Sequence, residues 1–131
     1  MSEQLEKLLI SGKELDQELL ATVLVDLVKI DKDSGEIRLT TKALNLPKRL
    51  QILIYITGRK AAKALDVIGE ERISPKELAS KLGMGGGSLR GQLHNLCKER
   101  LLEGVEGKYL VPNYAIEFVK ALLDEASRKE R

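Results

Sequence analysis

His94 and Cys97 are the side chains best suited to catalysis or metal binding, and they lie three positions apart in the sequence. On a helix this spacing fits a nucleophile with its general base, or two ligands of a metal. Catalysis also needs an orienting third group and a pocket. With only one His and one Cys in the chain, a metal would need carboxylate ligands. We therefore interpret Cys97 as a core residue, His94 as a surface residue, and the chain as a non-enzyme without cofactor or metal.

Gly85, Gly86 and Gly87 are the second candidate site, because backbone N–H groups at a glycine-rich helix start bind anions. A nucleotide loop is disfavoured, since these glycines follow a predicted helix rather than a strand and no Gly-Lys-Ser/Thr sequence occurs. Contact with a DNA phosphate and ordinary turn chemistry remain two open interpretations.

The period of the apolar residues predicts the elements that position these residues. Ser74-Pro75-Lys76-Glu77 has the pattern of a capping box and begins a short helix that Gly83 ends. A second helix follows over about 87–100, and residues 101–111 form a small hairpin with Glu106-Gly107 at its tip. The core side of the second helix holds Leu89, Leu93, Leu96, Cys97 and Arg100.

Upstream, Leu5, Leu8 and Leu9 have helical spacing, which resumes after Gly12, and alternation predicts a β-hairpin over about 27–40. Asn45 caps a helix that Gly58 interrupts by a bend or a break, and Asn113 caps a last helix. The fold class is therefore mainly α with small β-hairpins (α+β). One face of the last helix carries Tyr114, Ala115, Phe118, Val119, Leu122 and Ala126.

Composition narrows the classes of protein. A chain of 131 residues fits one domain, and its single cysteine excludes an intramolecular disulfide. No apolar run is long enough for a membrane span, so we expect a cytoplasmic protein. Aromatic residues make up 3% of the chain, too few for a base-stacking platform for single strands. Charged residues reach 32%, which favours a heat-adapted source.

Charge is divided along the chain. Residues 1–36 hold four basic and nine acidic residues, a net charge of −5, whereas residues 37–65 hold seven basic residues and no acid. Either the two blocks neutralise each other within the fold, or the basic block attracts a polyanion such as DNA.

The segment from Ser74 to Met84, followed by Leu89, Leu93 and Leu96, resembles the winged helix-turn-helix superfamily. The resemblance covers about residues 47–112 and includes a short strand at Ile73. It is similar to small archaeal and bacterial transcription regulators, with no subfamily assigned and a viral source left open.

The resemblance implies that the second helix of the motif lies in the major groove of double-stranded DNA. Arg90 would read guanine, and Asn95 or Gln92 would read adenine. His94 faces the groove with them. Ser88, Lys76, Lys81 and Lys98 would hold phosphates. Because Gly87 and Gly91 lack side chains on the same face, and Glu103 and Glu106 make the hairpin acidic, we expect weak or phosphate-dominated readout.

The alternative is a winged-helix adaptor that binds a protein partner at the Gly87/Gly91 helix face without binding DNA. The expected organisation is an accessory or dimerising segment 1–40, a winged helix-turn-helix over 41–112, and a helix over 113–131 that packs on the core or dimerises. We expect a homodimer, because two-fold DNA sites reward pairing.

Overall fold

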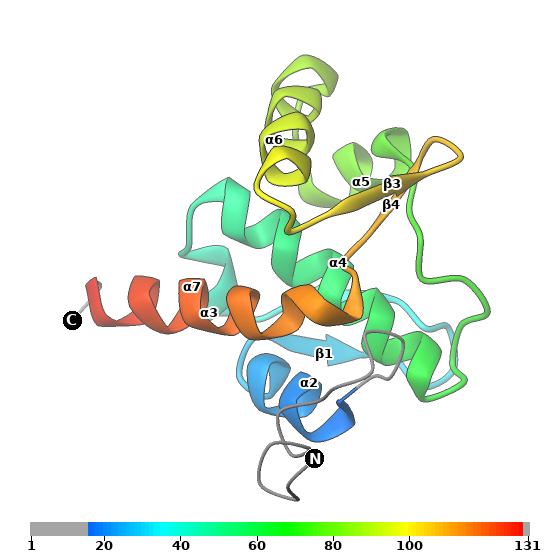
Figure 1. The fold of residues 1–131 in the computed structure, drawn as a ribbon. Coiled ribbons are helices and arrows are strands. Elements are labelled where there is room, and N and C mark those ends of the chain that lie inside the picture. Colours follow the sequence, from blue (N-terminus) through cyan, green and yellow to red (C-terminus); the bar gives the residue numbers. More distant parts are fainter. Residues whose placement is uncertain (1–15, 130–131) are drawn as a thin grey trace, which may run out of the picture.

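A computed structural model describes residues 16–129 of the chain. Within these residues the fold is α+β, with six α-helices, one short 3-10 helix and two separate antiparallel hairpins (Figure 1). The predicted helix around Leu5, Leu8 and Leu9 lies outside the described residues. Among the described helices, none combines the length and the apolar character needed to cross a bilayer. The elements in order are α2 (Gln17–Leu24), β1 (Val28–Ile30), β2 (Ile37–Leu39), α3 (Thr41–Leu44), α4 (Lys48–Ala64), α5 (Pro75–Leu82), α6 (Gly86–Lys98), β3 (Glu103–Val105), β4 (Lys108–Leu110), the 3-10 helix Asn113–Ala115 and α7 (Ile116–Lys129).

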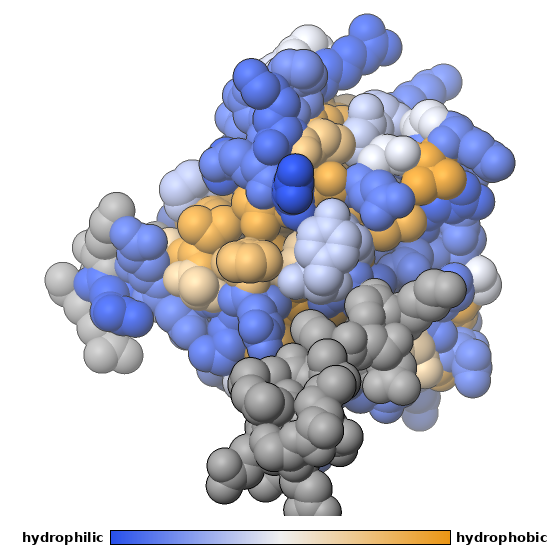
Figure 2. Space-filling view, viewed as in Figure 1, coloured by the Kyte–Doolittle hydropathy of each residue, from blue (hydrophilic) through white to orange (hydrophobic). Residues whose placement is uncertain are grey.

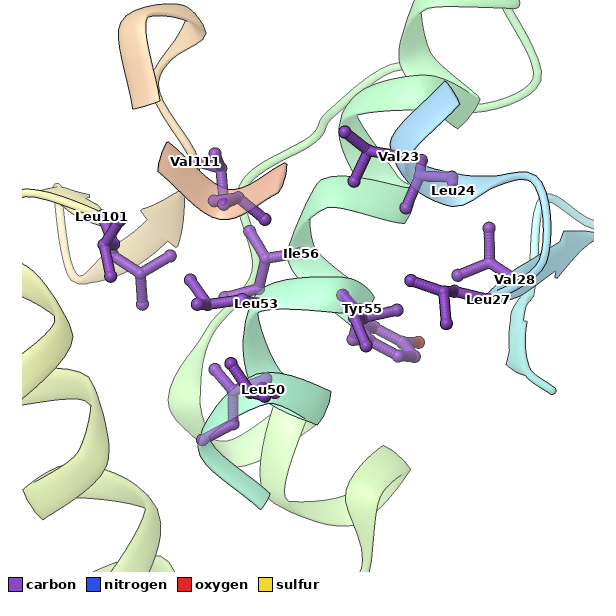
Figure 3. Close-up of a cluster of buried hydrophobic side chains, with 14 of the residues drawn as sticks. Val23, Leu24, Leu27, Val28, Leu50, Leu53, Tyr55, Ile56, Leu101 and Val111 are labelled. Carbon is purple, nitrogen blue, oxygen red and sulfur yellow. The ribbon is translucent and has the colours of Figure 1, made fainter. Parts of the chain in front are cut away.

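Helix α4 is the centre of the molecule, and every residue from 50 to 58 is buried. Its side chains point to opposite sides, with Leu53 and Ile56 toward Val111 and Tyr55 toward Leu27 (Figure 3). Accordingly α4 contacts both hairpins and the helices α2, α3, α5 and α7. This explains why its first half is apolar at almost every position, as a helix packed on several sides must be.

Gly58 does not break α4, which continues as one helix to Ala64. A Cβ atom at this position would lie 3.0 Å from Cγ2 of Ile37 and 3.6 Å from Cγ1 of Val28. The glycine therefore allows the β1–β2 hairpin to pack closely on the helix.

The β1–β2 hairpin confirms the prediction for residues 27–40, with Val28 opposite Leu39 and Ile30 opposite Ile37. Asp31 begins its turn, and its Oδ1 accepts hydrogen bonds from the backbone N–H groups of Ser34 and Asp33, at 2.9 and 2.8 Å. These two bonds hold the pKa of the Asp31 carboxyl below its usual value, with Ser34 as the larger cause. The turn is therefore specified locally.

Two predicted caps are wrong. Asn45 ends the short helix α3, for which the sequence gives no signal, and Pro47 is the residue that precedes α4. Pro112 precedes the 3-10 helix, and the Asn113 side chain accepts a hydrogen bond from Lys60.

Helix α7 is apolar on two sides rather than one. Ile116, Val119 and Leu123 are buried in the core, whereas 48% of Tyr114 and 63% of Phe118 is exposed. The predicted apolar face, which joined Tyr114 and Phe118 to Val119, is thus split between the core and the surface.

Candidate nucleic-acid interface

Helices α5 and α6 pack against each other through buried leucines of both helices. Ser74 begins α5, and its Oγ accepts a hydrogen bond from the backbone N–H of Glu77 at 3.2 Å. Gly83 ends α5 in the left-handed conformation, with φ +64°. Both ends of this helix confirm the sequence prediction, and the buried contacts fix the position of α6. The leucines are Leu78, Leu82, Leu89, Leu93 and Leu96.

Helix α6 ends two residues earlier than predicted. Lys98 is its last residue, and Arg100 takes a left-handed conformation with φ +62°. The predicted core position of Arg100 is therefore wrong, because the residue lies beyond the helix and is exposed.

The hairpin β3–β4 is held beside the start of α5. Ile73 and Tyr109 exchange two backbone hydrogen bonds, with N–O distances of 3.0 and 2.9 Å, so that Ile73 forms the predicted short strand as a bridge. At the tip, Glu106 and Gly107 both have positive φ, which gives a tight two-residue turn. The hairpin projects beside α5 in Figure 1.

The structure places most of the predicted contact residues on exposed surface. On α6, Arg90 and His94 are one turn apart, and Asn95 and Lys98 continue the same surface. Gln92 is half-buried, so less of its side chain is available than predicted. The exposed candidates are Lys76, Lys81, Ser88, Arg90, His94, Asn95 and Lys98.

These side chains differ in whether they already form a hydrogen bond or an ion pair with other residues of the fold. Within residues 16–129, Lys76, Arg90 and Lys98 form no hydrogen bond or ion pair through their side chains, and the same holds for His94 and Asn95. Lys81 is the exception, because its Nζ lies 3.9 Å from Oε1 of Glu36. A polyanion at this surface would therefore meet cations that have no competing partner in the described chain.

The basic block 37–65 behaves differently, because several of its residues are used inside the fold. The Arg59 guanidinium donates to the carbonyl oxygens of Glu70, Glu71 and Arg72, at 2.7, 3.1 and 3.2 Å. Lys60 is buried and its Nζ lies 2.8 Å from Oε2 of Glu71. These cations stabilise the segment that leads into α5.

At the other end of α4, Arg49 forms an ion pair with Glu99, and Lys48 donates to the carbonyl of Leu82 at 3.1 Å. The Arg49 hydrogen bond holds the pKa of Glu99 below its usual value. Arg49 and Lys60 are thus neutralised by acidic side chains within the fold, whereas Lys48 and Arg59 bond to backbone carbonyl oxygens. The acidic partners Glu71 and Glu99 follow residue 65, and no ion pair joins the basic block to an acidic residue of the described part of 1–36, residues 16–36.

Four glycines open the face of α6. A Cβ atom at Gly85, Gly86, Gly87 or Gly91 would meet no atom within 4 Å, and none of the four has a positive φ. Neither packing nor backbone conformation within the described chain requires glycine here. Since glycine in a helix costs about 1 kcal/mol relative to alanine, a close approach by another molecule would explain Gly87 and Gly91.

Cys97 and His94 do not converge on a reactive arrangement. Cys97 is half-buried against the core, and burial raises the pKa of its thiol, which lowers the thiolate fraction at neutral pH. His94 points to solvent as an exposed residue. No three His, Cys, Asp or Glu side chains gather as metal ligands in residues 16–129.

The hairpin contributes little positive charge. Glu103 and Glu106 are exposed, as is Lys108, and Oε2 of Glu106 lies 3.6 Å from Nη1 of Arg72. This surface therefore repels phosphates more than it attracts them, in contrast to α6.

Comparison of the chain with protein-family models, curated proteins and solved structures finds no match.

Proposed function

We propose that residues 41–112 form a winged helix-turn-helix and that the protein is a DNA-binding transcription regulator. The order α4, Ile73 strand, α5, α6 and hairpin supports this fold. The observation that carries the function is the exposed surface of α6, where Arg90 and Lys98 have no ionic partner within the described chain. Cations of this kind are available to replace the counterions of a DNA phosphate backbone.

In the proposed complex α6 lies in the major groove of a duplex. Arg90 binds a guanine edge, and Asn95 binds an adenine edge. His94 faces the groove with them, and the half-buried Gln92 lies at the margin of this contact. Ser88, Lys76 and Lys98 hold phosphates, and Lys81 does so only in competition with Glu36.

The open glycines fit a complex dominated by backbone contacts. Gly87 and Gly91 offer no side chain to a base, but they allow the helix to approach the DNA closely. The N-terminal N–H groups of α6 then face a phosphate. Base specificity rests on few side chains, so we expect modest discrimination between sequences.

Fluorescence anisotropy with a labelled duplex, selected from a random pool by the protein, tests the proposal. We expect Arg90→Ala to weaken binding by about 1–3 kcal/mol, as for loss of a guanine contact. Arg38→Ala is the matched control, because Arg38 is an exposed arginine on β2. Equal effects of the two substitutions, or absence of any selected sequence, would contradict base reading by α6.

A protein-binding adaptor is the second candidate, and the same glycines favour it. The face at Gly87 and Gly91 is open enough for another helix to pack closely. In that case Gly91→Arg blocks a partner captured by the wild-type chain, and duplex affinity is negligible in both proteins. An unchanged partner profile would remove this candidate.

A further inference from the structure

A groove of about 500 Å³ lies between the end of α6 and helix α7. Its apolar lining includes Leu101, Phe118, Ala121 and Leu122. In Figure 2, apolar side chains gather on the face in view between α6 and α7. This groove is separate from the α6 surface that carries Arg90 and is not used by the proposed DNA complex.

The second apolar side of α7 forms one wall of the groove. Phe118 and Leu122 lie one turn apart along it, on a different side from the buried Ile116 and Val119, and Tyr114 of the preceding 3-10 helix lines the same groove. Phe118 is 63% exposed, although a phenylalanine buries a large apolar surface when it is covered. Within residues 16–128, Leu122 is half-buried against the core, whereas Tyr114 and Phe118 remain exposed.

We propose that a second copy of this chain covers the groove, in a two-fold dimer formed through α7. The groove supplies both halves of such an interface, since Phe118 projects from its wall and the small residue Ala121 leaves space beside it. A two-fold axis brings the projecting ring of each copy to the groove of the other. A surface that carries both a projecting ring and a space beside it is complementary in shape to a second copy of itself.

The charges around the groove also favour a second copy. The charged residues that line the groove, which we call its rim, are Arg49, Glu99, Arg100 and Glu125, two of each sign. The rim is therefore neutral overall and carries both signs, which makes it complementary to itself. A strongly acidic or strongly basic peptide would not be matched by such a rim.

This interface does not depend on DNA binding, and it is tested without nucleic acid. Sedimentation equilibrium of the full chain is measured from about 1 μM to about 1 mM, where weak association becomes populated. We expect a monomer–dimer equilibrium whose Kd rises at least tenfold in Phe118→Ser, because exposed aromatic anchors carry much of the affinity of an interface. Leu65→Ser is the control, since Leu65 is 66% exposed and lies on the far end of α4.

A charge variant tests the rim in the same way. Arg100→Glu makes the rim of each copy acidic, so the two rims repel each other and the Kd rises most at low salt. Thermal melts confirm that each variant is folded, as expected for exposed positions. A monomer at every concentration would overturn the proposal. A dimer that is insensitive to Phe118→Ser would overturn it as well.

Discussion

Nζ of Lys60 lies 2.8 Å from Oε2 of Glu71, with 6% of the lysine side chain exposed. The same Nζ donates to Oδ1 of Asn113 at 2.7 Å. One buried cation thus joins α4 to the segment before α5 and to the start of the last helical segment. It is a structural charge, unlike the exposed cations of α6.

Removing this lysine leaves Glu71 without its main partner in a largely buried position. We expect Lys60→Ala to lower the free energy of unfolding by about 3 kcal/mol. Urea denaturation measures the change, with Lys63→Ala as the control because Lys63 is exposed on the same helix. Similar unfolding free energies for the two variants would show that the buried pair does not stabilise the fold.

Gly58 and Gly91 are both inside helices, but their surroundings predict opposite responses to a side chain. Gly58→Val places methyl groups against Ile37, and we expect a loss of about 1–3 kcal/mol of stability from overpacking. Gly91→Ala meets no atom within 4 Å, and we expect a gain of about 1 kcal/mol from helix propensity. Thermal and urea unfolding of both variants test the signs.

If Gly91 serves close approach to DNA, stability and binding separate at this residue. A larger apolar side chain, as in Gly91→Leu, is then expected to preserve the fold but to weaken duplex binding at least tenfold. Anisotropy titration checks this. Unchanged affinity in Gly91→Leu would mean that the glycine face is not in contact with the duplex.

The contribution of Asp31 to the stability of the β1–β2 turn depends on pH. Its pKa is lowered in the folded protein, so its stabilising effect is present above the unfolded pKa and is lost as the pH falls through the folded value. In Asp31→Asn this dependence is absent. We expect the difference in stability between wild type and Asp31→Asn to shrink as the pH falls from about 5 to about 2. Chemical denaturation at several pH values measures it, and a constant difference would contradict this role.

Local signals predicted the local structure well. Ser74 with Glu77 predicted the start of α5, and alternation predicted the first hairpin over about 27–40. The hydrogen bonds that hold the cap and the hairpin turn join residues two or three positions apart. The sequence around Gly58 does not predict the role of this glycine, because the hairpin that packs on it lies more than twenty residues earlier in the chain. Composition around a residue carries no information about a contact of that kind.

In the candidate site, too, the sequence predicted local features but not contacts between distant residues. Helical spacing was enough to place Arg90, His94, Asn95 and Lys98 on an exposed surface. It was not enough to show that Lys60 and Arg59 are used internally, because their partners lie at least eleven residues away along the chain. The sequence likewise does not show that Phe118 is exposed, because both sides of α7 are apolar in sequence.

The most direct test of the account is the salt dependence of duplex binding. The logarithm of the binding constant is measured against the logarithm of salt concentration for wild type, Lys98→Ala and the control Arg38→Ala. We expect binding at about 50 mM salt that falls steeply as salt rises, with a slope reduced by about one in Lys98→Ala and unchanged in the control. No binding at about 50 mM salt, or a slope that Lys98→Ala leaves unchanged, would contradict the assignment of α6 as the DNA-contacting surface.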